Sequence, residues 1–207
     1  MKQILKHPEI YQLYQELGGF FGARVKAIRD YLPIRPGDRV IDIGCGPGHI
    51  VKYLPKGIDY AGFDVDEPSI AYARKRFGAR GRFECRLFDG AAVKEFGPAD
   101  VVMMNGVMHH IGDDDLDATL ANIRAVLKPG GRLFTLDGAY GPGQGWLETW
   151  LLDNDRGVHV REAEGYRRLL DRAFGDVAMH VRNDYSRLPY TFAIGVARRE
   201  QEQAAAA

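Results

Sequence analysis

The chain has 207 residues, a length that fits one domain with a sizeable core, and 45% of its residues are hydrophobic. Its 28 Lys and Arg residues balance 28 Asp and Glu residues, so no net charge draws the chain to nucleic acid or to an anionic membrane. Two cysteines exclude a disulfide framework, and the lack of an apolar leader or of a run of ~20 apolar residues predicts a cytoplasmic protein without stable membrane insertion.

The first predicted elements are two helices, over residues 8–17 and 20–31, with Gly18 and Gly19 between them. From residue 39 onward, apolar runs typical of strands alternate with helical patterns. The predicted strands are 39–43, 60–64, 82–87, 100–104 and 132–136, and the predicted helices are 47–54, 67–77 and 113–127. Strands that alternate with helices indicate an α/β fold, with a parallel sheet covered on both faces.

The pattern changes after Asp137. Residues 138–145 are rich in glycine, 146–152 are amphipathic and 162–174 are helical, while 177–181 and 190–196 are typical of two closing strands. We interpret 138–160 as a cap inserted into a single domain over residues 1–199. Within that domain, residues 1–36 are the N-terminal helices, and residues 200–207 form a disordered, solvated tail outside it.

Glycine is in excess, with 25 residues, about 12% of the chain against a usual ~7%. Three of them, Gly44, Gly46 and Gly48, directly follow the first predicted strand. Such a turn lets a ligand approach the backbone at the carboxyl end of a strand, where open α/β sheets bind ligands. His49 stands where a dinucleotide fingerprint has its third glycine, which favours a nucleotide-like ligand without a pyrophosphate.

Two acidic residues follow the next predicted strands. Asp64 lies twenty residues after Gly44, where a carboxylate accepts from both hydroxyls of a ribose. Asp89 comes after the third strand and is suited to accept from the exocyclic amine of an adenine. We expect Phe63 or Phe88 to flank that ring.

Four segments in order carry a resemblance to a known family. They are Val-Ile-Asp-Ile-Gly-Cys-Gly-Pro-Gly at 40–48, Gly-Phe-Asp-Val-Asp-Glu-Pro-Ser-Ile-Ala-Tyr-Ala-Arg at 62–74, Asp-Val-Val-Met-Met-Asn-Gly-Val-Met-His-His at 100–110 and Leu-Lys-Pro-Gly-Gly-Arg-Leu at 127–133. Residues 38–137 thereby resemble the class I S-adenosylmethionine-dependent methyltransferases, in the small-molecule branch that includes the ubiquinone/menaquinone-type enzymes. The resemblance implies a Rossmann-like, doubly wound sheet of seven strands, mostly parallel with the last strand antiparallel.

The resemblance also implies S-adenosyl-L-methionine as cofactor and S-adenosyl-L-homocysteine as product. The three glycines would surround the methionine part of the cofactor, with Asp42 near its amino group and Asn105 near the amino acid and sulfonium. The implied cofactor-binding residues are Asp42, Gly44, Gly46, Gly48, Asp64, Val65, Asp89 and Asn105.

Three residues at strand ends are candidates for catalysis. Methyl transfer to a hydroxyl benefits from a general base, and histidine is best suited to take a proton near neutral pH. His109 and His110 follow the fourth strand, and Asp137 ends the fifth. We predict that one histidine, assisted by Asp137, is the base for a hydroxyl acceptor. The alternative is that one histidine is buried and hydrogen-bonded, the other lines the cofactor site, and Asp137 is a turn residue.

Aromatic residues outside the sheet are the expected cover of the acceptor pocket, with 138–145 as its hinge. They are Tyr11, Tyr14, Phe20, Phe21, Trp146 and Trp150. For the two tryptophans, core or dimer packing is the alternative, and a monomer and a homodimer both remain open.

Two other functions compete with a small-molecule methyltransferase. A dinucleotide-dependent reductase is disfavoured by the missing third glycine, and a non-catalytic cofactor-binding protein would keep the same residues. Asn105-Gly106-Val107-Met108 lacks the Asn/Asp-Pro-Pro-Tyr/Phe segment typical of amine methylation on nucleic acid. No Cys-x-x-Cys or histidine cluster accompanies the two cysteines, so no metal is expected.

Overall fold

The computed structural model describes residues 18–155 and 157–201. The predicted helix over 8–17 lies outside the described residues. The helices are α2 (Phe20–Tyr31), α3 (Glu67–Phe77), α4 (Gly90–Phe96), α5 (Asp113–Val126), α6 (Trp146–Asp153) and α7 (Ala163–Ala173), with short 3-10 helices η2 (His49–Tyr53) and η3 (Met108–His110). The strands are β1 (Arg39–Ile43), β2 (Asp59–Asp64), β3 (Arg82–Cys85), β4 (Ala99–Asn105), β5 (Leu127–Tyr140), β6 (Arg161–Glu162), β7 (Asp176–Arg182) and β8 (Phe192–Arg198).

The strands form one sheet in the order β3-β2-β1-β4-β5-β8-β7. β8 is antiparallel to both of its neighbours, and the other ladders of this path are parallel. The predicted α/β fold of seven strands with an antiparallel last strand is therefore confirmed. A two-residue strand, β6, was not predicted, and it pairs in parallel with the end of β5.

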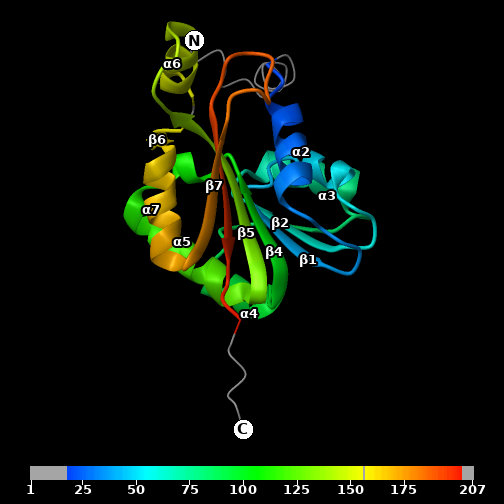
Figure 1. The fold of residues 1–207 in the computed structure, drawn as a ribbon. Helices are drawn as coiled ribbons and strands as arrows, with labels where there is room; N and C mark the ends of the chain where they lie inside the picture. Colours follow the sequence, from blue (N-terminus) through cyan, green and yellow to red (C-terminus); the bar gives the residue numbers. More distant parts are fainter. Residues whose placement is uncertain (1–17, 156, 202–207) are drawn as a thin grey trace.

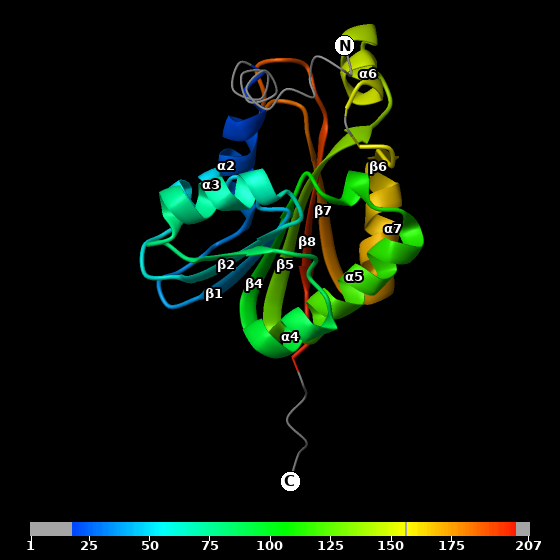
Figure 2. The same ribbon diagram turned by 180° about the vertical axis from the view of Figure 1, so that it is seen from behind.

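Each face of the sheet has its own hydrophobic core. Successive side chains of a strand point to opposite faces, so Val40 of β1 packs with α2 and α3, whereas Ile41 packs with α4, α5 and α7. Figures 1 and 2 show these two sets of helices on either side of the sheet. Among the described helices, none has both the length and the apolar character needed to cross a bilayer.

Three elements differ from the predicted ones for local reasons. The expected helix over 47–54 is the shorter η2, because Gly48 before it adopts a left-handed φ of 72°. α4 was missed because its seven residues are too few for a clear hydrophobic period. β5 extends to Tyr140, well beyond the predicted end.

The cap region departs most from expectation. Gly138 was assigned to a flexible hinge, but it lies inside β5, where an added Cβ would overlap Tyr190 Oη. α6 projects beyond the carboxyl end of the sheet (Figures 1 and 2). It is anchored by buried Glu148, which accepts hydrogen bonds from Thr191 Oγ1 and from Gln144 Nε2.

Candidate functional site

The glycine turn joins β1 to η2 at the carboxyl edge of the sheet. Gly44, Gly46 and Gly48 all have left-handed backbone, with φ of 72°, 52° and 72°, a conformation that residues with a Cβ rarely adopt. Gly44 N–H donates to the carbonyl of Phe63 at 2.7 Å, and Gly46 N–H donates to Asp64 Oδ2 at 2.8 Å. The turn is thus fixed to the end of β2.

The three glycines differ in their surroundings. A Cβ on Gly44 would overlap Val107 Cγ2, and one on Gly48 would lie 2.7 Å from Phe83 Cε1. A Cβ on Gly46 would have no neighbour within 4 Å among residues 18–155 and 157–201. Gly44 and Gly48 therefore allow the turn to pack, whereas Gly46 leaves its backbone open to a ligand.

The two predicted carboxylates lie at the ends of β2 and β3. Asp64 is half-buried, and its Oδ1 accepts from Asp66 N–H at 2.9 Å. Asp89 is the N-cap of α4, and its Oδ1 accepts from the N–H groups of Ala91 and Ala92 at 3.0 and 2.9 Å. These bonds, chiefly that from Ala92, lower the pKa of Asp89. Within the described part of the chain, Asp89 Oδ2 accepts no hydrogen bond.

The expected aromatic flank at this edge is wrong. Phe63 and Phe88 are 1% and 6% exposed, and their rings pack edge to face in the core with centroids 5.1 Å apart. The apolar side chains exposed after these strands are Val65, at 65%, and Leu87, at 72%. Val65 was predicted as a site residue, whereas Leu87 was missed because an exposed leucine has no sequence signature.

Buried polar atoms without partners lie in β1 and β4, beside the glycine turn. Asp42 and Asn105 are 1% and 8% exposed. Tyr60 Oη donates to Asp42 Oδ2 at 2.7 Å, but among the described residues Asp42 Oδ1 and both polar side-chain atoms of Asn105 have no hydrogen-bond partner. Burial raises the pKa of Asp42 to about 7. Because buried polar groups are nearly always hydrogen-bonded, these atoms mark a place for a polar ligand.

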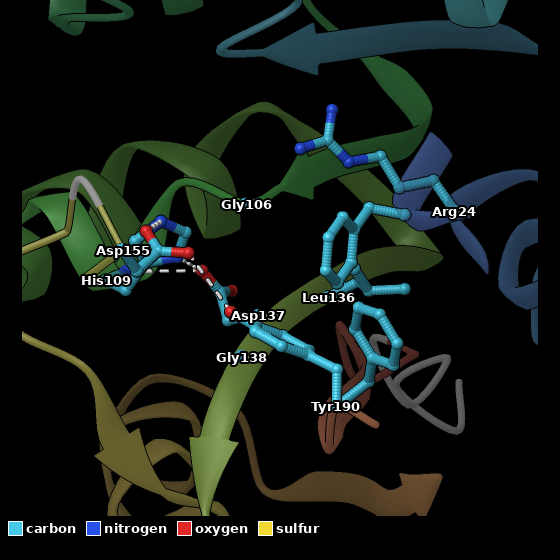
Figure 3. Close-up of a pocket in the computed structure, with 10 residues that line it drawn as sticks. Arg24, Gly106, His109, Leu136, Asp137, Gly138, Asp155 and Tyr190 are labelled. Atoms are coloured by element: carbon cyan, nitrogen blue, oxygen red, sulfur yellow. Dashed lines mark hydrogen bonds and ion pairs between the residues drawn. The ribbon is translucent and has the colours of Figure 1, made fainter. Parts of the chain in front are cut away.

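Arg24 of α2 joins the site, although sequence reasoning missed it. Figure 3 shows its side chain extending from the helix into the pocket. Its Nη2 would lie 3.1 Å from a Cβ on Gly106, the residue after Asn105. Its charge opposes the effect of burial on the pKa of Asp42. Arg24 forms no ion pair with any described residue.

A buried cluster of charged residues lies just after the end of β4 and beside the last part of β5. His109 and Asp137 are 7% and 2% exposed, and Asp155 follows α6. His109 Nδ1 lies 2.6 Å from Asp137 Oδ1, and His109 Nε2 lies 3.2 Å from Asp155 Oδ1 (Figure 3). The structure thus brings together His109 and Asp137, both predicted site residues, and adds Asp155.

The two carboxylates control the charge of the histidine. Burial lowers the pKa of His109, but the hydrogen bonds and charges of Asp137 and Asp155 outweigh burial and raise it to about 9. Burial alone would raise the pKa of Asp155, yet its contact with His109 keeps it well below the ordinary value. Asp137 Oδ2 is buried and has no hydrogen-bond partner in the part of the chain that the structure describes.

A small cavity of about 40 Å³ lies among these groups. Its polar lining includes Arg24, His109, Asp137 and Asp155, and its aromatic lining consists of Phe20, Tyr190 and Phe192. A water molecule occupies about 30 Å³ in the liquid. The cavity can therefore hold water while Asp155 contacts His109, but it is far smaller than a small-molecule site.

Most of the other predicted pocket residues lie elsewhere. Trp146 and Trp150 of α6 are 81% and 40% exposed, and neither lines the cavity. Phe21 packs against Tyr53, with ring centroids 5.5 Å apart. His110 is exposed, with its ring centroid 4.2 Å from that of His109. Of the six predicted aromatic residues, Phe20 reaches the cavity, and Tyr11 and Tyr14 lie outside the described residues.

A family model described as a methyltransferase domain matches residues 41–133. These residues form a methyltransferase domain. A solved structure of human N-acetylserotonin methyltransferase with S-adenosylmethionine has the same fold as this domain, with a TM-score of 0.67 and 20% identity. That likeness covers 86% of this chain and 52% of the human one.

Relatives of the methyltransferase domain carry different names. Phosphoethanolamine N-methyltransferase 1 of Triticum aestivum is 28% identical over 188 residues, which cover 87% of this chain and 37% of the relative. Ubiquinone biosynthesis O-methyltransferase of Bordetella avium is 27% identical over 115 residues, which cover 54% of this chain and 47% of the relative. The chain spans less than half the length of both relatives.

The residues that match the methyltransferase domain include only part of the site. Its residues 41–133 contain the glycine turn, the carboxylates of the strand ends and His109. Arg24, Asp137 and Asp155 lie outside the match. Among residues 18–155 and 157–201, no group of three His, Cys, Asp or Glu side chains could hold a metal ion.

Proposed function

We propose that the chain transfers the methyl group of S-adenosylmethionine to a small-molecule acceptor. The observation that carries this proposal is the set of buried, unpartnered polar atoms on Asp42 and Asn105 beside an open glycine turn. An amino acid group satisfies them. Its ammonium fits Asp42, its carboxylate fits the guanidinium of Arg24, and the Asn105 amide offers a donor and an acceptor.

The rest of the cofactor fits the neighbouring strand ends. Asp64 is suited to the ribose hydroxyls, because each of its oxygens keeps a lone pair after accepting from the backbone. Asp89 Oδ2 is suited to the exocyclic amine of the adenine. Val65 and Leu87 are exposed apolar side chains that the base would cover. The open backbone at Gly46 suits the methionine part.

We further propose a hydroxyl oxygen as the acceptor atom and His109 as its base. When bound, the cofactor supplies a methyl group on a sulfonium, and the acceptor atom must be held in line, ~3 Å from the methyl carbon. Asp137 fixes the His109 ring through Nδ1, which directs Nε2 toward the pocket. General base catalysis is typically worth ~10²–10⁴-fold. His110, exposed beside His109, is the other candidate base.

An amine acceptor is the second candidate. Two carboxylates surround one imidazolium, so the cluster favours the positive charge that an amine gains on methylation. The two relatives described above include an N-methyltransferase and an O-methyltransferase by name, so they support both acceptor atoms.

Calorimetric binding followed by labelled methyl transfer tests the proposal. We expect S-adenosylmethionine and S-adenosylhomocysteine to bind, and Asp42→Asn to weaken binding at least tenfold, because an amide cannot pair with the ammonium. The matched control is Asp59→Asn, whose carboxylate pairs with Arg39 at the opposite end of β2 and should leave binding unchanged. Binding of a nicotinamide dinucleotide instead of S-adenosylmethionine would establish the reductase.

An acceptor panel then decides the acceptor atom. Label transferred to hydroxyl compounds supports the proposal, and label transferred only to amines supports the second candidate. Tight cofactor binding without transfer to any member of a broad panel would favour a non-catalytic binding protein. The expected cytoplasmic location, the lack of a nucleic-acid partner and the open choice of monomer or homodimer stay predictions.

A further inference from the structure

The segment that follows α6 docks directly on the His109 ring. Asp155 Oδ1 contacts His109 Nε2, and its Oδ2 accepts from Tyr190 Oη at 3.1 Å. The backbone is fixed as well, because His159 N–H donates to the His109 carbonyl at 2.9 Å. Gly157 lies against the same ring, where any Cβ would overlap His109 Cδ2. Asp155 is thus held in place from several sides.

The contacts of Asp155 and Asp137 determine the protonation of His109. A neutral imidazole has one N–H, so it donates at one nitrogen only. Here a carboxylate faces each nitrogen, and both contacts are satisfied only when both nitrogens carry protons. Other charged or titratable groups lie on the elements packed around the ring. They are Arg24 beyond Gly106, His110 with its ring tilted by 44° against that of His109, Tyr190 and Tyr166 beside the two carboxylates, and His159 and Arg161, which donate to the His109 and Met108 carbonyls. The arrangement therefore favours an imidazolium, which has no lone pair to accept a proton.

The docked position of Asp155 also excludes the acceptor. The cavity beside it holds about 40 Å³, far less than the ~300–1,000 Å³ of a small-molecule site. An acceptor hydroxyl can reach His109 Nε2 only at the place that Asp155 Oδ1 occupies. Acceptor binding and the Asp155 contact are therefore mutually exclusive.

We propose that Asp155 is a positioning residue that keeps His109 protonated until the acceptor takes its place. This inference rests on the proposed methyl transfer to a hydroxyl. When Asp155 withdraws, the Nε2 proton passes to water, and the neutral ring stays oriented by Asp137. The acceptor hydroxyl then donates to Nε2. As the carbon–sulfur bond breaks and the carbon–oxygen bond forms, the hydroxyl proton moves to Nε2, and Asp155 can pair with the ring again.

Nitrogen NMR of the full chain, with ¹⁵N-labelled histidine, tests the assignment without cofactor or acceptor. His109 is assigned by the signals lost in His109→Gln. We expect both ring nitrogens of His109 to be protonated at pH 7, with a midpoint near 9. Asp155→Asn keeps the shape of the side chain and removes its charge, so the midpoint should fall by about one pH unit or more.

The matched control is Asp153→Asn. It makes the same charge change two residues earlier, at a carboxylate that accepts from Tyr140 Oη, and should leave the His109 midpoint unchanged. Asp155→Glu restores the carboxylate and should return the His109 midpoint most of the way to its wild-type value. A midpoint equal in wild type and Asp155→Asn, or a His109 that is neutral at pH 7 in the wild type, would overturn the inference. Failure of the proposed function would appear separately, as absent cofactor binding in calorimetry or as absent label transfer to the acceptor panel.

Discussion

Asp42 is the residue whose ionisation controls the proposed cofactor site. Its pKa of about 7, raised by burial, means that much of the free protein carries a neutral Asp42 below pH 7. Only the carboxylate pairs with an ammonium. We expect the affinity for S-adenosylmethionine to fall roughly tenfold from pH 7 to 5.5. Calorimetry at both pH values checks this, and a pH-independent affinity in the wild type would count against the pairing. Asp42→Asn should bind weakly at both.

Two glycines of the turn have different expected roles: Gly44 chiefly in stability and Gly46 chiefly in ligand binding. Gly44→Ala should lower the free energy of unfolding by about 2–4 kcal/mol, because it combines a left-handed φ with overlap on Val107. Gly46→Ala should cost only about 1–2 kcal/mol, since its Cβ meets open space. Chemical denaturation measures both. Cofactor binding should nevertheless be lost in Gly46→Ala, and unchanged binding there would argue against a ligand at that face.

His109 makes stability depend on pH. Its folded pKa of about 9 lies above the ordinary 6.5, so its stabilising effect is complete below pH 6.5 and is lost as pH rises through 9. The unfolding free energy should fall by about 2–3 kcal/mol between these values, relative to His109→Gln. Parallel denaturation series of the two proteins give this difference. If the unfolding free energies of wild type and His109→Gln changed equally with pH, the His109 ring would not be charged in the folded state.

At the scale of elements, α6 owes its position to one face only. Leu152 is 1% exposed and belongs to the core, whereas Trp146 is 81% exposed. Leu152→Ala should cost about 2–5 kcal/mol of stability. Trp146→Ala should change stability by less than about 0.5 kcal/mol and leave the cavity intact. Thermal melts distinguish the two. A large loss for Trp146→Ala would require a contact that the described residues do not provide.

Helices and strands were predicted accurately where local sequence signals determine their ends. α3 was predicted to the residue because Asp66 caps it and Gly78 ends it. The ends of β5 were not predicted correctly. The length of this strand depends on pairing with β4, β6 and β8 rather than on its own sequence. The glycine turn and its acidic partners carry a motif. Arg24 and Asp155 reach the site from distant segments and carry none.

At the scale of the whole molecule, the strand order predicts which backbone amides are best protected from hydrogen exchange. β1, β4 and β5 are the three central strands of the sheet, whereas β3 pairs only with β2 and β7 only with β8 at its edges. Backbone amides of the three central strands should therefore exchange with solvent most slowly. Hydrogen exchange read by mass spectrometry checks this. Faster exchange in β4 than in β3 would contradict the order.

The position of β8 in the sheet has a consequence for folding during synthesis. It is the last described strand in sequence, yet it lies inside the sheet, between β5 and β7. On the ribosome, β7 therefore emerges before the strand that joins it to the rest, and the edge of β5 stays open until residues 192–198 have left the exit tunnel. Unpaired edges are sites of aggregation. Until β8 emerges, the nascent chain exposes two of them at once, so we expect this stage to be the one at which the domain is most prone to aggregation.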